Sequence, residues 1–345
     1  MTEIQTNTNG MIKSRIVEID YSKAILIFLV VLGHCLEPLM SMAVAEQIYL
    51  FIYIFHMPFF IFFSGYLSKF NLKKQFELIV VFWIYQVLYS LMASEIYGVF
   101  AISFDTPFWI MWYLLSLIVW RFTVPLLDLM KKYAFIVVAV LVLFSLAIGY
   151  VDYVDQLWGL SRTIVFYPYF VFGYYVKCNK NYNKKRSHPL LLFMQIVMLS
   201  VLVIFIIFSP QALISEFCLY GVRNYKFVGN GLLQRSIAYA AAFLGINLWR
   251  QIKFPRENKF CLLVSSNTLY IYLLHGFVMF LMAHYSVLPK TWVGIVLSFV
   301  IAIFLTTILA FVGCGYNYLK NLVLKKLKQK REVAWLPFCL RWVIN

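Results

Sequence analysis

Long stretches of mostly apolar residues recur about ten times along this chain of 345 residues, and each is long enough to cross a membrane as a helix. A transmembrane helix needs about 20 such residues to span a hydrocarbon core of about 30 Å. Hydrophobic residues make up 63% of the sequence and charged residues 13%, whereas soluble domains carry about 25% charged residues. The sequence therefore predicts an all-α fold, a polytopic transmembrane helix bundle of about ten spans.

Short polar connections separate the expected spans, so the chain is expected to form one membrane domain with two flanking segments. Residues 1–21 are an expected cytoplasmic N-terminal segment, 22–319 the transmembrane domain and 320–345 a basic cytoplasmic tail. The tail alternates cations with apolar residues, which fits either a helix on the anionic inner leaflet or a solvated tail. The expected spans cover residues 22–40, 47–67, 76–97, 108–127, 133–151, 163–176, 190–209, 232–249, 262–284 and 292–316.

The basic residues indicate how the bundle is oriented in the membrane. With the N-terminus in the cytoplasm, most of the 30 Lys and Arg residues fall in cytoplasmic connections. The exceptions are Arg162, Arg223, Lys226, Arg235 and Lys290. Cytoplasmic loops are enriched in Lys and Arg, so we expect both termini in the cytoplasm of a multi-pass protein of the cell membrane. The cations form short clusters and no continuous face, so the net charge of +16 does not indicate nucleic-acid binding.

Three of the five histidines fall in the middle of expected spans. At 1.5 Å per residue, His34, His56 and His275 lie roughly 18, 16 and 20 Å from the cytoplasmic side. Ionisable side chains are costly in a bilayer and often functional, and a neutral imidazole is a suitable general base. Glu37, one turn from His34, is placed to orient it. Any one of these histidines alone fits equally well as a packed residue bonded to a neighbouring helix, but three at one depth favour a functional cluster.

Several short motifs follow one another along the chain. The first is RIVEIDYSK at 15–23 with GH at 33–34, and the second is FHMPFF at 55–60 with SGYL at 64–67. Later motifs are WYL at 112–114, Arg162 with FYPYF at 166–170, and LYIYLLH at 269–275. Together they resemble the acyltransferase 3 family of membrane enzymes, most closely its sugar and fucose O-acetyltransferase branch. One departure is Lys23, where many members carry Arg, because Lys keeps the charge but loses the bidentate fork for phosphate.

This resemblance implies an O-acetyltransferase that moves acetyl from cytosolic acetyl-CoA to a hydroxyl of an extracytoplasmic or lipid-linked saccharide. It implies acetyl-CoA as co-substrate with no bound cofactor, and it leaves direct transfer and an acetyl-histidine intermediate both open. The six cysteines are scattered singly with no CxxC pair, so no metal site is expected. The expected site residues are His34 as general base, His56 and His275 assisting it, Lys23, Lys69 and Lys73 for the CoA phosphates, and Arg162, Trp112 and Tyr113 for the acceptor.

Each of these groups also has a purely structural interpretation. Positive-inside topology alone explains the lysines, and snorkelling to the membrane interface explains Arg162. An aromatic belt at the interface explains Trp112 and Tyr113. In the second span, Pro58 has no backbone N–H to donate, which predicts a kink beside His56.

A proton-coupled transporter or flippase of a saccharide or lipid-linked substrate is the main alternative, because intramembrane histidines also relay protons. Transporters are often built from inverted repeats with matching broken spans, and the sequence shows neither. A structural membrane protein is a third possibility, and it leaves the three histidines at one depth unexplained. We therefore expect an enzyme.

Overall fold

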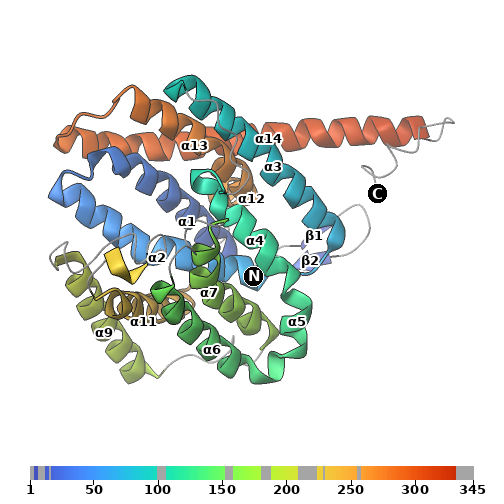
Figure 1. The fold of residues 1–345 in the computed structure, drawn as a ribbon. Coiled ribbons are helices and arrows are strands. Elements are labelled where there is room, and N and C mark those ends of the chain that lie inside the picture. Colours follow the sequence, from blue (N-terminus) through green and yellow to red (C-terminus); the bar gives the residue numbers. More distant parts are fainter. Residues whose placement is uncertain are drawn as a thin grey trace.

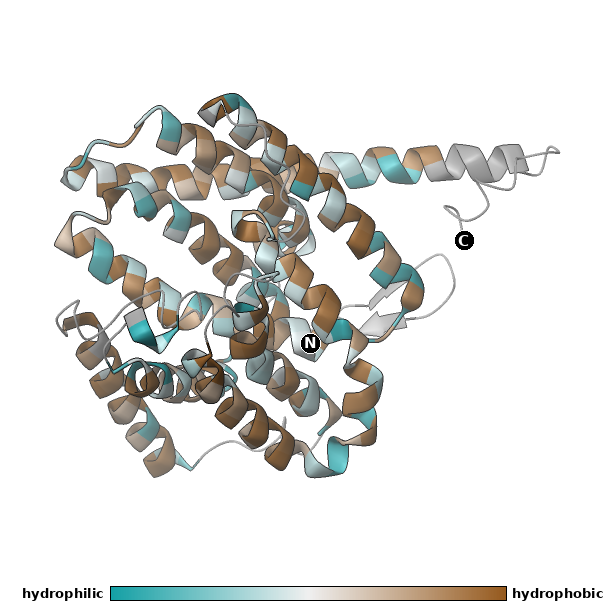
Figure 2. Ribbon diagram, viewed as in Figure 1, coloured by the Kyte–Doolittle hydropathy of each residue, from teal (hydrophilic) through white to brown (hydrophobic). Residues whose placement is uncertain are grey.

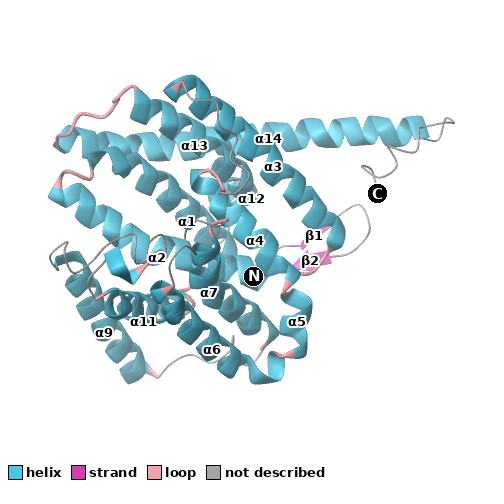
Figure 3. Cartoon of the chain, viewed as in Figure 1, coloured by secondary structure: helices cyan, strands magenta, loops and turns pink. Residues whose placement is uncertain are grey.

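A computed structural model describes most of the chain, namely residues 4–6, 12–14, 17–98, 106–151, 158–179, 188–208, 224–227, 230–254 and 258–331. Nearly all of these residues are helical (Figure 3). In the described residues, strands occur as one short antiparallel hairpin of β1 (Ile4–Thr6) and β2 (Ile12–Ser14). The expected all-α membrane bundle is therefore confirmed.

The helices form a bundle in which chain order follows the expected spans (Figure 1). Short 3-10 helices occur between or beside them, at η1 (Glu37–Leu39), η2 (Trp109–Met111), η3 (Lys131–Tyr133), η4 (Ile148–Tyr150) and η5 (Tyr225–Phe227). The α-helices are α1 (Val17–Leu36), α2 (Ala43–Leu67), α3 (Leu72–Tyr97), α4 (Trp112–Phe122), α5 (Val124–Leu129), α6 (Ala134–Ala147), α7 (Leu160–Cys178), α9 (Pro189–Phe208), α11 (Gly231–Trp249), α12 (Lys259–Ser266), α13 (Thr268–His284) and α14 (Trp292–Arg331).

Every expected span overlaps one helix or a pair of helices, but two of them are interrupted. The ninth breaks at Asn267, whose side-chain amide donates to the carbonyl of Leu263, and α12 and α13 are bent by 73° there. The fourth is split into α4 and α5, with Pro125 in the first turn of α5. By length and hydropathy five described helices qualify as spans, and six if the bent pair is one broken span. The count of ten spans and their orientation stay predictions.

The outer surface of the bundle is apolar, and Figure 2 shows hydrophobic residues along most helices. Phe135 and Leu143 on α6 and Phe208 on α9 are among the exposed large side chains. Soluble proteins do not expose large contiguous apolar patches of this kind. The outer surface therefore suits contact with lipid.

The first two long helices lie inside the bundle. The helix α1 packs against α2, α12, α13 and α14, and α2 also packs against α7 and α11 (Figure 1). As a result, side chains on α1 and α2 meet those on α13 in the interior.

Two glycines allow α2 and α7 to approach closely. A Cβ atom on Gly65 would lie 1.9 Å from the carbonyl oxygen of Phe170, and one on Gly173 would lie 1.9 Å from that of Phe62. Small residues let helix backbones come together in membranes. The close approach of α2 and α7 is therefore reciprocal, with one glycine on each helix.

The last helix, α14, runs unbroken from Trp292 to Arg331, across the boundary expected between the transmembrane domain and the tail. Its C-terminal part extends away from the other helices in Figure 1. The described part of the tail is thus a continuation of α14, and residues 332–345 lie outside the described residues.

Candidate active site

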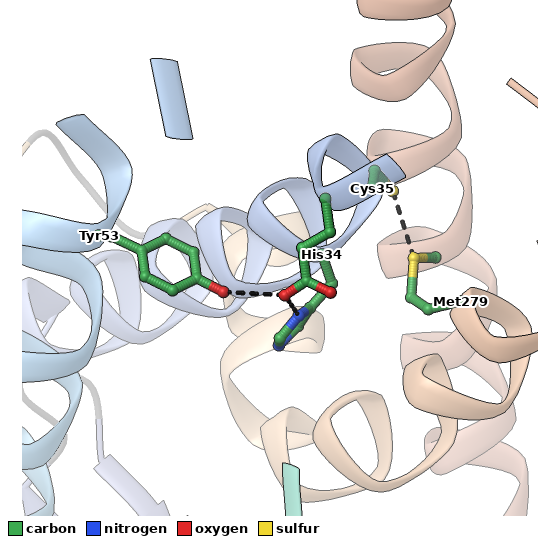
Figure 4. A network of polar contacts seen from close by, with 5 residues as sticks. His34, Cys35, Tyr53 and Met279 are labelled. Atoms are coloured by element: carbon green, nitrogen blue, oxygen red, sulfur yellow. Dashed lines mark hydrogen bonds and ion pairs between the residues drawn. The ribbon is translucent and has the colours of Figure 1, made fainter. Parts of the chain in front are cut away.

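His34 lies near the end of α1, with a mostly buried ring that is held by a carboxylate. Its Nδ1 is 2.7 Å from Oε1 of Glu37, the first residue of η1. Tyr53 on α2 donates its hydroxyl to the same carboxylate oxygen at 3.1 Å, and Figure 4 shows His34 and Tyr53 converging on it. The carboxylate therefore joins α1 to α2 and orients the imidazole.

His275 and Trp109 pack against the ring of His34. His275 lies on α13 and is fully buried, and its ring centroid is 5.3 Å from that of His34. The ring of Trp109 meets His34 edge to face at 4.8 Å. Trp109 also has a φ of 33°, a value that residues other than glycine rarely adopt and that tends to occur at functional sites.

His56 on α2 completes the cluster. It is buried, and its ring centroid lies 4.6 Å from that of Tyr53. Because Tyr53 also reaches Glu37, it connects His56 with His34. The three histidines that the sequence placed at one depth, His34, His56 and His275, thus lie in one cluster, called the histidine cluster below.

Each histidine of the cluster has its Nδ1 next to an oxygen that accepts hydrogen bonds. The acceptors are the carboxylate of Glu37 for His34, the carbonyl of Ile52 at 2.9 Å for His56, and the carbonyls of Ile271 and Tyr272 at 3.0 and 2.8 Å for His275. Since these oxygens accept a hydrogen bond, Nδ1 carries the proton in each neutral ring and Nε2 carries the lone pair. Within the described residues, Nε2 of His275 is buried and has no hydrogen-bond partner. A substrate hydroxyl would satisfy it.

Pro58 lies two residues beyond His56 and does not interrupt α2. The helix continues through it from Ala43 to Leu67, and the proline ring is buried. Pro58 therefore does not end the helix, and the kink expected beside His56 stays a prediction.

The three lysines expected to bind the donor lie at the end of the bundle where α1 and α3 begin and α2 ends. Nζ of Lys23 is 2.5 Å from the carbonyl oxygen of Ser265, beside the break between α12 and α13. The Ser265 hydroxyl in turn donates to Asp20 at 2.6 Å. Lys23 therefore holds the broken helix to α1, whereas Lys69 and Lys73 are exposed. Within the described residues, no group of three His, Cys, Asp or Glu side chains is placed to hold a metal ion.

The structure brings two of the three expected acceptor residues together. The guanidinium of Arg162, in the first turn of α7, lies 5.4 Å from the ring centroid of Trp112. Tyr113 instead pairs its hydroxyl with that of Ser64 at 2.7 Å, about 12 Å along α2 from His56 toward the lysine end.

Sequence reasoning missed Tyr53 and Trp109. Tyr53 precedes His56 by three residues and so lies on the same face of α2, which is a signal that was available. For Trp109 no such signal exists, because it lies in the short η2 and reaches His34 only through the tertiary fold.

Comparison with protein families identifies the family to which the helix bundle belongs. A model of the acyltransferase 3 family, described as an acyltransferase domain, matches residues 16–314. The match begins just before α1 and ends in α14, so it contains every helix of the histidine cluster. Neither the curated proteins nor the solved structures gave a match. Because the family model covers most of the chain, this protein belongs to the acyltransferase 3 family and is a membrane acyltransferase.

Proposed function

We propose that this protein is an O-acetyltransferase of the cell membrane. It takes acetyl from cytosolic acetyl-CoA and passes it to a hydroxyl of an extracytoplasmic or lipid-linked saccharide. The observation that supports this most strongly is the bond between His34 and Glu37, next to His275 in the bundle interior. An imidazole oriented by a carboxylate is a general base that acyl-transfer enzymes use.

In the proposed reaction, Nε2 of His34 accepts the proton of the acceptor hydroxyl. The hydroxyl oxygen attacks the thioester carbonyl, a C–O bond forms and the C–S bond breaks. The sulfur of CoA leaves as a thiolate and takes the proton back from the imidazolium, so the base is regenerated. Glu37 supports this cycle because its negative charge stabilises the imidazolium while the proton is on the ring.

His275 and His56 suit the orientation of a substrate hydroxyl. With Nδ1 donating to a backbone carbonyl, each neutral ring offers an acceptor at Nε2 and no further donor. An oxyanion needs hydrogen-bond donors, which these two rings supply only after they are protonated. In the variant with an acetyl-histidine intermediate, Nε2 of His34 is the atom that would carry the acetyl group.

Groups toward the two ends of the bundle suit the two substrates. Lys23, Lys69 and Lys73 offer cations to the phosphates of CoA at one end. Toward the other end, Arg162 over Trp112 offers a cation and a flat aromatic surface, which suit a sugar ring or a lipid phosphate. Donor and acceptor would thus approach the histidine cluster from opposite sides of the membrane.

A transfer assay in inverted vesicles tests the proposal. Vesicles that contain the protein are given CoA labelled in its acetyl group, and the saccharide fraction is scored for label. We expect label with the native chain and none with His34→Ala vesicles that hold equal amounts of protein. Saccharide movement without label would favour the transporter alternative. Absence of label from the saccharide fraction with both the native chain and His34→Ala, and no saccharide movement, would refute the assigned donor and acceptor.

A further inference from the structure

A large groove of 1210 Å³ lies between α6, α7, α9 and α11. None of its lining residues belongs to α1, α2 or α13, so it is separate from the histidine cluster. Figure 1 shows these four helices together at the lower side of the bundle, away from α13 and α14. Its walls are largely apolar and include Phe135, Val138, Phe243 and Leu244.

One end of the groove is polar. Among the described residues that line it, Lys131, the first residue of η3, is the only charged one. Tyr175, in the last turn of α7, and Asn179, which directly follows that helix, also line it. Tyr175 is 5% exposed, and within the described residues its buried hydroxyl has no hydrogen-bond partner. A buried hydroxyl without a partner is uncommon unless a ligand or water completes it, so this end of the groove has the properties of a binding site.

The position of the polar end indicates what binds there. At the polar end of the groove, α7 ends and the chain enters α6. A membrane surface is expected where transmembrane helices begin and end. Lys177 belongs to the same level and donates to the carbonyl of Ser68, where α2 ends. The polar end of the groove is therefore on the same side of the bundle as Lys23, Lys69 and Lys73, and clustered cations attract anionic headgroups.

We propose that this groove binds a phospholipid with an anionic headgroup. The headgroup phosphate binds Lys131 and accepts a hydrogen bond from the hydroxyl of Tyr175, and the acyl chains lie along the apolar walls. The amides of Gln195 and Asn247, which bond to each other at 3.0 Å, also line the groove. They offer hydrogen bonds to ester carbonyls, which a polyprenyl phosphate does not have. This site goes beyond the proposed transferase function and does not depend on it.

Native mass spectrometry of the full-length detergent-purified protein with equimolar phosphatidylglycerol and phosphatidylcholine tests the polar end. We expect the native chain to retain phosphatidylglycerol preferentially. Lys131→Gln should weaken this retention about fivefold, the factor that one cation near an anionic membrane surface contributes. Tyr175→Phe should also weaken it. Lys132→Gln and Tyr174→Phe are matched controls, because neither neighbour lines the groove, and both should retain the lipid as the native chain does.

The apolar walls are tested by filling the groove. Ala240→Phe places a ring in the groove from α11 and should remove bound lipid of both kinds, and Ala139→Leu does the same from α6 if the first variant does not fold. Equal losses in Lys131→Gln and Lys132→Gln would mean attraction to a general basic surface and would overturn the site. Unchanged lipid retention in a folded groove-filling variant would overturn it as well, and so would preferential retention of phosphatidylcholine or of an added polyprenyl phosphate.

Discussion

The Nδ1 atom of His34 and the Oε1 atom of Glu37 lie 2.7 Å apart, three residues from each other at the junction of α1 and η1. In the proposed mechanism this bond fixes which nitrogen of the ring is basic. We expect Glu37→Ala to lower kcat about ten- to a hundredfold, by analogy with the range seen when the hydrogen-bond partner of a metal-bound histidine is removed. Glu37→Gln, which keeps an acceptor but loses the charge, should fall between Glu37→Ala and the native enzyme. Steady-state kinetics with labelled acetyl-CoA measure both.

The KM for acetyl-CoA distinguishes orientation from general damage to the site. If Glu37 only positions His34, KM should change little in these variants. Tyr53→Phe is the matched control, since it removes one bond to Glu37 and keeps the ring beside His56. Its kcat should fall less than that of Glu37→Ala, and the reverse order would assign the larger role to Tyr53.

His34→Ala should abolish acetyl transfer while the protein remains folded and inserted. General-base catalysis contributes about 10² to 10⁴ in rate, whereas one imidazole among many packed side chains contributes little to the stability of the bundle. His284→Ala is the control, because His284 ends the helix that carries His275 and is exposed. Transfer rate and elution volume on size exclusion are measured together. Full activity in His34→Ala would move the base to another residue.

The sequence predicted helices better than it predicted breaks within them. The expected span 232–249 matches α11 (Gly231–Trp249) almost to the residue, because an apolar run between polar ends is a strong signal. The break at Asn267 was missed, because the short polar run at 265–268 is averaged with the apolar residues around it in a 20-residue window. At the break the side chain of Asn267 bonds to the carbonyl of Leu263, a local contact that hydropathy does not contain.

The sequence grouped the three histidines of the candidate site but did not predict which other side chains they contact. The fixed rise of a helix placed His34, His56 and His275 at one level, and they do meet in the structure. Trp112 and Tyr113 were grouped because they are neighbours in sequence. Successive helical residues point about 100° apart, so the side chains of Trp112 and Tyr113 meet different partners, Arg162 and Ser64.

Gly173→Ala should destabilise the bundle by about 1 to 3 kcal/mol, the usual effect of overpacking. The added Cβ would lie 1.9 Å from the carbonyl oxygen of Phe62, and backbone atoms cannot move aside without separating α7 from α2. Thermal unfolding in detergent measures the change. Gly315→Ala on α14 is the control, since a Cβ there has no neighbour within 4 Å, and it should leave stability unchanged or raise it slightly. Equal melting temperatures for the two variants would contradict the tight crossing.

Reporter fusions test the orientation expected from the basic residues. A reporter after Asn345 should be cytoplasmic, and one inserted near Gln156 should be external, because cytoplasmic loops are enriched in Lys and Arg. Alkaline phosphatase and green fluorescent protein report opposite sides of the membrane, so fusing each of them at the same position gives two readings that must agree. An external C-terminal reporter would change the number of spans and with it the estimated depths of the histidines.

Lys23→Gln should raise KM for acetyl-CoA with a smaller fall in kcat. Lys23 precedes His34 by eleven residues and so lies about 16 Å from it along α1, which suits a contact with the phosphates of CoA and not with the thioester. The loss should therefore act mainly on ground-state binding. Lys23→Arg should be tolerated, and the defect should grow with salt, which screens the remaining cations.

The bond from Lys23 to the carbonyl of Ser265 gives this residue a second possible role, as a clamp on the broken helix α12–α13. The two roles predict different results for Lys23→Gln. Loss of a donor contact leaves the melting temperature unchanged and is overcome by saturating acetyl-CoA, whereas loss of a clamp lowers the melting temperature and is not overcome. Lys259→Gln is the control for surface charge, because Lys259 is exposed at the start of α12. An equal fall in kcat and kcat/KM, with stability intact, would instead mean that Lys23 acts in the transition state, which its distance from His34 along α1 argues against.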